Sequence, residues 1–268
     1  MAEDFRAVAL HDLIIDDERS FAHVAIYGEL AKALSGAAHR FWVPVDGARV
    51  TWDRALFLNL TYWSATEGAD VLCEDHLPAD VLAHIAWHHV VGTRLARPGA
   101  AAKPSAASML FAESIASAFD MYLVGRLLWN APESDFITTQ VPLISACAED
   151  AGLSEAAIEA LLAEVAGEPE RAFEDLRALL FEAATSLLAC PGVMEAAAVL
   201  KRFEGRRFGP LLHHFQLSNW ILYARAYAAD PAQPDPAVDA AAAALGDAPD
   251  SLEWLRRNWL EPAMATAG

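Results

Sequence analysis

The sequence is most informative at residues 79–91, which read ADVLAHIAWHHVV. His84 and His88 are four residues apart, so on an α-helix both imidazoles leave the same face about one turn apart. This spacing allows two imidazoles to bind one metal ion from a single helix. Most of the surrounding side chains are apolar, and buried histidines need polar partners. The stretch therefore predicts a buried helix that supplies two metal ligands.

A third ligand is expected from the next predicted helix. Glu113, Ser117 and Asp120 are spaced there at i, i+4 and i+7, and they form a narrow polar stripe between apolar residues. A buried carboxylate needs a cation or several donors nearby, and a metal shared with His84 and His88 would be that cation. We therefore expect Glu113 to be a metal ligand. Ser117 and Asp120 are expected to hold a ligand histidine and fix its tautomer.

This layout resembles the gluzincin metallopeptidases, which carry His-Glu-x-x-His on one helix and a Glu on the next. The likeness covers residues 79–124 only, and it implies that His84, His88 and Glu113 bind the metal. The general base of that family is the Glu after the first histidine, and Ile85 stands in that position here. A general base contributes about 10²–10⁴-fold to the rate. Chemistry other than ordinary peptide hydrolysis is therefore expected.

Two histidines are candidates for the acid–base group that Ile85 does not provide. His89 follows His88 directly, although on a helix it points roughly 100° away from it. His214 lies in another predicted helix, in the stretch PLLHHFQLSNW at residues 210–220. Both are kept as candidate catalytic residues.

Other interpretations of the triad remain open. Two histidines and one carboxylate also form the facial triad of non-haem iron oxygenases. Residues 77–88 are in addition similar to the metal-binding DinB-like bundles. Outside enzymes, the chain would be a helical interaction protein with a structural metal or none, its histidines hydrogen-bonded in the core. We predict a mononuclear metal-dependent enzyme with one divalent ion, Zn²⁺ favoured over Fe²⁺, acting on a small molecule or peptide.

The rest of the chain predicts an all-α fold, a multi-helix bundle-like domain with one short β-hairpin near residues 40–51. We expect a single domain over residues 1–268, in which residues 1–130 carry the metal site and residues 131–268 form a helical cover. Helices are predicted at residues 20–34, 52–68, 79–95, 106–129, 134–150, 154–166, 169–189, 192–203, 208–229, 235–245 and 250–260.

Charge and cysteine content narrow the function classes. The chain has 19 basic and 37 acidic residues, a net charge of −18. Such a surface repels phosphate backbones and anionic lipids, so neither nucleic acid nor a membrane is expected as a partner. The 3 cysteines form no disulfide framework, and the first residues do not read as a signal peptide. A cytoplasmic location is therefore expected, while the oligomeric state is left open.

Overall fold

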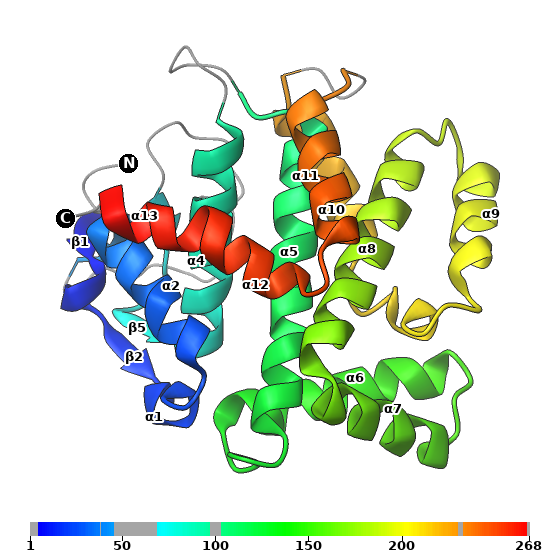
Figure 1. Cartoon of the computed structure of the whole chain (residues 1–268), viewed down its shortest axis with the longest axis horizontal. Helices are drawn as coiled ribbons and strands as arrows, with labels where there is room; N and C mark the ends of the chain where they lie inside the picture. Colours follow the sequence, from blue (N-terminus) through cyan, green and yellow to red (C-terminus); the bar gives the residue numbers. More distant parts are fainter. Residues whose placement is uncertain (1–4, 38, 46–68, 97–102, 230–232, 267–268) are drawn as a thin grey trace. The chain divides into compact units, whose positions relative to one another are not determined.

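The computed structural model describes residues 5–37, 39–45, 69–96, 103–229 and 233–266 (Figure 1). Helices dominate these residues, which confirms the predicted all-α class. The chain divides into two compact units, residues 1–104 with 256–268 and residues 105–255. Each unit is described by itself below. The expectation of a single domain stays a prediction.

The first unit contains the described strands. They are β1 (Phe5–Ala9), β2 (Ile14–Asp16), β3 (Arg40–Pro44), β4 (Ala69–Val71) and β5 (His76–Pro78). Strand β3 pairs antiparallel with β1 and parallel with β4, while β2 pairs parallel with β5. The predicted strand after residue 40 is therefore present, but both of its edges are taken by strands distant in sequence. The second strand of the predicted hairpin and the helix predicted at residues 52–68 lie outside the described residues.

The helices of the first unit are η1 (Leu10–Asp12), α1 (Glu18–Phe21), α2 (Ala25–Gly36), α4 (Ala79–Leu95), the π-helical turn η3 (Arg256–Leu260) and α13 (Glu261–Thr266). They pack mainly on α2, which contacts α4, η3 and α13. Helix α4 begins directly after Pro78, as predicted, and it packs against α2 and η3. The guanidinium of Arg256 in η3 donates two hydrogen bonds, of 2.7 and 2.8 Å, to the carboxylate of Glu29 in α2. This bidentate pair fixes η3 against α2.

Among its described residues, the second unit contains helices and no strand. Its elements are α5 (Ala106–Leu127), α6 (Asp135–Asp150), α7 (Glu155–Gly167), α8 (Pro169–Leu188), α9 (Val193–Phe203), η2 (Gly209–Leu211), α10 (Leu217–Tyr227), α11 (Pro236–Asp247) and α12 (Ser251–Leu255). Helix α5 packs against α6, α7, α8, α10 and α11. The helix predicted at residues 208–229 is interrupted, because a turn at residues 212–216 separates η2 from α10.

Helix α5 is the core of this unit. Of its 22 residues, only Ala107, Glu113, Asp120 and Arg126 are not fully buried. By length and composition α5 would be apolar enough to cross a membrane, but 83% of the relevant window is buried inside the protein. Burial of this kind is typical of the central helix of a helical core. It leaves Glu113 and Asp120, seven residues apart, as the acidic positions on the helix.

Gly125 allows α5 to approach α7 and α8 closely. A Cβ atom at this position would lie 2.6 Å from the carbonyl oxygen of Val165 and 2.9 Å from Cβ of Pro169. Both atoms belong to ordered helices of the same unit, so neither can move aside easily. By contrast, a Cβ atom added at Gly28 in α2 would meet nothing within 4 Å.

We expect Gly125→Ala to destabilise the protein by about 1–3 kcal/mol, because the added methyl group overpacks the contact of α5 with α7 and α8. Gly28→Ala is the matched control, and it should stabilise the protein by up to about 1 kcal/mol through its better helix propensity. Urea unfolding followed by circular dichroism measures both changes. A Gly125→Ala protein as stable as the wild type would show that the close approach is not a packing constraint.

Candidate metal centre and adjoining cavity

His84 and His88 lie on one face of α4, as their spacing predicts. Their ring centroids are 5.0 Å apart, and both side chains are half-buried. The helix is anchored by its fully buried residues Ala83, Ala86 and Trp87, which leave the two histidines beside the packed face. One helical turn thus brings two imidazoles together without help from any other part of the chain.

Glu113 completes a group of three residues able to hold a metal ion. The ligand-capable atoms of His84, His88 and Glu113 all lie within 4.8 Å of one another, and all three side chains are half-buried. Two imidazole nitrogens and one carboxylate oxygen suit Zn²⁺ and also Fe²⁺. The donor set therefore fits a divalent metal ion and leaves the identity of the metal open between these two.

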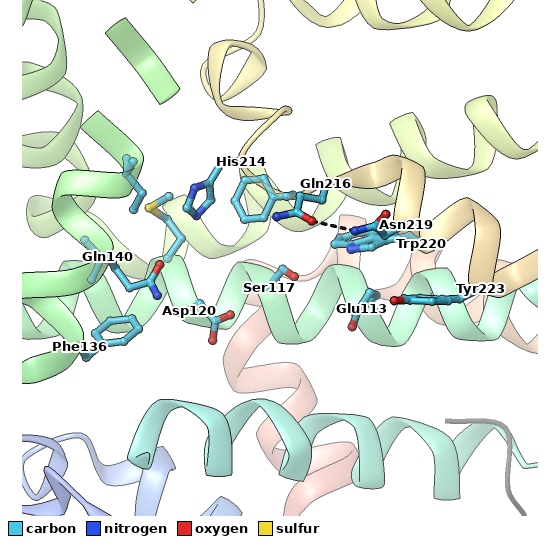
Figure 2. Close-up of a pocket in the computed structure, with 14 residues that line it drawn as sticks. Glu113, Ser117, Asp120, Phe136, Gln140, His214, Gln216, Asn219, Trp220 and Tyr223 are labelled. Atoms are coloured by element: carbon cyan, nitrogen blue, oxygen red, sulfur yellow. Dashed lines mark hydrogen bonds between the residues drawn. The ribbon is translucent and has the colours of Figure 1, made fainter. Parts of the chain in front are cut away.

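A cavity of about 320 Å³ lies beside Glu113 within the second unit. Figure 2 shows Glu113, Ser117 and Asp120 in a row along α5, with side chains from α6, the turn before α10, and α10 around them. The lining residues are Glu113, Ser117, Asp120, Met121, Val124, Phe136, Gln140, Ile144, His214, Phe215, Gln216, Asn219, Trp220 and Tyr223. The polar stripe predicted on α5 therefore borders a cavity.

The structure brings some of the predicted site residues to this cavity. Ser117, Asp120 and His214 line it together with Glu113. Their predicted roles, hydrogen bonding to a ligand histidine for the first two and proton transfer for His214, stay predictions. His214 comes from the turn between η2 and α10, which ends at Gln216 in a left-handed conformation (φ 48°).

His89 lies in a different environment. Its ring makes an edge contact with the ring of His39, with centroids 5.9 Å apart. Nε2 of His39 is 2.8 Å from Oδ2 of Asp70, the second residue of β4. Burial, and then the nearby His39, lower the pKa of His89 below its ordinary value. His89 belongs to the first unit and is not among the residues that line the cavity of the second unit. Its proposed catalytic role stays a prediction.

The cavity gives His214 the properties of a neutral base. Burial lowers the pKa of His214 below its ordinary value, and the carboxylate of Asp120 opposes that change. A neutral imidazole can accept a proton, and a nearby carboxylate stabilises the imidazolium that forms. At the other end of the cavity, burial, then Tyr227 and then Glu113 raise the pKa of the Tyr223 phenol, so this group stays protonated near neutral pH.

Several cavity residues carry no signal in the sequence. Gln140 comes from α6, whereas Asn219, Trp220 and Tyr223 come from α10. The amide of Asn219 donates a 2.7 Å hydrogen bond to the side-chain carbonyl of Gln216, which is drawn in Figure 2. No spacing rule connects α6 and α10 to α5, because their meeting depends on packing between distant segments.

No family model, curated protein or solved structure matches this chain. The resemblance to gluzincins therefore rests on the three residues His84, His88 and Glu113 alone. The chemistry of these residues and of the cavity beside Glu113 is what bears on function.

We expect the stability of the protein to fall more steeply below about pH 6.5 in the wild type than in His214→Gln. The lowered pKa means that the unfolded chain binds a proton at His214 more readily than the folded chain. The contribution of this group to stability is therefore present above the unfolded pKa and is lost as the pH falls through the folded pKa.

Urea unfolding of both proteins at pH 7.5 and pH 5.5 measures the effect, and an NMR titration of the His214 ring measures its pKa directly. All other titrating groups are common to the two proteins, so the difference between them isolates His214. Equal losses of stability in the two proteins, or a ring pKa at or above its ordinary value, would contradict this expectation.

Proposed function

We propose that this protein is a mononuclear metal-dependent enzyme whose divalent ion is bound by His84, His88 and Glu113. The observation that carries the proposal is the approach of their ligand atoms to within 4.8 Å of one another. Three protein ligands leave coordination positions open, as catalytic sites require, whereas structural zinc sites are closed by four. A bound ion would supply Lewis acidity, either to a water molecule or to an oxygen atom of the substrate.

The cavity supports a catalytic role because one of the proposed metal ligands lines it. Glu113 borders a space of about 320 Å³, which is large enough for a small molecule or for one or two residues of a peptide. Polar and charged side chains lie in it beside aromatic and aliphatic ones, and the polar groups of such a site orient a ligand. The substrate class that we propose is therefore a small molecule or a peptide end.

We propose His214 as the general base, in place of the Glu that follows the first histidine in the gluzincins. Ile85 is half-buried and apolar, so the position after the first histidine cannot accept a proton. His214 lines the same cavity as Glu113, and its lowered pKa keeps the ring neutral near pH 7. In this role His214 would take a proton from the substrate or from water, and Asp120 would stabilise the resulting imidazolium.

Non-haem iron chemistry is the second candidate function. The apolar Ile85 favours it, since an iron facial triad of two histidines and one carboxylate needs open positions and no neighbouring base. Hydrolytic and redox chemistry would use the same three ligands. Metal identity therefore separates the two candidates.

We expect the purified protein to contain about one zinc or iron ion per chain, with zinc favoured. His84→Ala, His88→Ala and Glu113→Gln should each lower the metal content at least tenfold, because each removes one of three ligands. His11→Ala, whose side chain is 84% exposed, is the matched control and should keep the wild-type content. Plasma mass spectrometry measures the metal, and circular dichroism verifies that each variant is folded.

Zinc in the wild type would favour the hydrolytic candidate, and iron the redox candidate. A folded wild-type protein without stoichiometric metal, or a folded His88→Ala protein with the wild-type content, would refute the proposed site. A His84→Ala protein that loses metal but keeps its fold and its activity would refute the catalytic role.

A further inference from the structure

Two residues that line the cavity, Glu113 of α5 and Tyr223 of α10, face each other. Figure 2 shows the hydroxyl oxygen of Tyr223 directed at the carboxylate of Glu113. The two helices pack against each other, and both belong to the second unit. The phenol therefore approaches the proposed metal ligand from a wall of the cavity.

The electrostatic coupling of the two groups agrees with this arrangement. Burial, then Tyr227 and then Glu113 raise the pKa of the Tyr223 phenol, and a carboxylate has such an effect only on a group close to it. A phenol with an ordinary pKa of about 10 already carries its proton at neutral pH. Tyr223 is therefore a hydrogen-bond donor, and the ionised carboxylate beside it is an acceptor.

A carboxylate ligand has two oxygen atoms, and its metal site has to determine which of them binds the ion. One ligand-capable oxygen of Glu113 lies within 4.8 Å of the ligand-capable nitrogens of His84 and His88. The side chain is half-buried, and an ionised oxygen is costly to remove from water unless it accepts a hydrogen bond. A donor at the second oxygen would satisfy that oxygen and hold the carboxylate in one orientation.

Tyr223 provides a constraint that the neighbours of Glu113 on its own helix do not. Ser117 lies one turn away on α5 and moves with that helix. Tyr223 comes from α10, three residues after the buried Trp220. Its aromatic side chain has only two torsions, so little conformational entropy is lost when it is held in place. A phenol from a second helix thus restrains Glu113 relative to the cavity wall.

We propose that Tyr223 positions the metal ligand Glu113. Its phenol donates a hydrogen bond to one carboxylate oxygen and leaves the other oxygen to bind the ion beside His84 and His88. This inference rests on the proposed function, because it concerns the same ion. Tyr223 acts through Glu113 and is a positioning residue. Mutation of such partners of metal ligands typically lowers metal affinity about 10–100-fold.

The zinc affinity of the metal-free protein tests this role. The purified protein is treated with EDTA, dialysed, and titrated with Zn²⁺ in competition with a chromophoric chelator. We expect Tyr223→Phe, which removes only the hydroxyl group, to weaken zinc binding about 10–100-fold. Tyr227→Phe is the matched control. This tyrosine lies one turn further along α10 and is not among the residues that line the cavity, so the variant should keep the wild-type affinity.

Two further measurements separate positioning from a general loss of structure. The visible spectrum of the Co²⁺-substituted protein reports the coordination geometry, and it should change in Tyr223→Phe but not in Tyr227→Phe. In a Glu113→Gln background, Tyr223→Phe should lose most of its effect on zinc affinity, because the two residues act as one unit. Circular dichroism verifies the fold. If Tyr223→Phe does not fold, Tyr223→Leu carries the same expectations.

The failure of this inference differs from the failure of the proposed function. Wild-type zinc affinity together with an unchanged Co²⁺ spectrum in folded Tyr223→Phe would overturn the inference and leave the metalloenzyme standing. An equal loss of affinity in the wild-type and Glu113→Gln backgrounds would also overturn it, since Tyr223 would then act independently of Glu113. A wild-type protein that binds neither Zn²⁺ nor Co²⁺ would refute the proposed metal site and, with it, the role of Tyr223.

Discussion

The burial of α5 is the constraint on which the second unit depends. Helices α6, α7, α8, α10 and α11 of the same unit pack on this helix, and all but four of its 22 residues are buried. Carboxylates are rarely placed on so enclosed a helix, because removing their charge from water costs several kcal/mol unless it is compensated. Glu113 and Asp120 are nonetheless there, on one face. Two acidic residues on a core helix are most simply understood as site residues, and the cavity along that face supplies the reason for their position.

Two other helices of the unit, α6 and α10, form walls of the cavity beside this stripe. Helix α6 contributes Phe136, Gln140 and Ile144, and α10 contributes Asn219, Trp220 and Tyr223. Each wall therefore combines apolar side chains, which pack, with an amide or a hydroxyl, which orients a ligand. Gly125, next to the lining residue Val124, allows α7 and α8 to approach α5 closely.

Local periodicity carried most of what the sequence could predict. The start of α4 follows from Pro78, and the shared face of His84 and His88 follows from helical geometry. Glu113, Ser117 and Asp120 were also predictable as one stripe, because they lie within two turns of one helix. The partners of β3, the turn within residues 208–229, and the contribution of Gln140 were not predictable, since each depends on which distant segments meet in the core. Sequence spacing contains no information of that kind without a family pattern to supply it.

The turn before α10 contains a strained residue, Gln216, and also carries the cavity residue His214. Gln216 adopts φ 48° and ψ 47°, a left-handed conformation that costs a residue other than glycine roughly 1–2 kcal/mol. This residue ends the turn that carries His214 and starts the helix that carries Asn219 and Tyr223. A continuous helix over residues 208–229 would avoid the strain, but it would carry His214 and α10 in a different direction. The strain is consistent with a turn shaped by the position of His214, because unfavourable backbone conformations persist where the surrounding structure requires them.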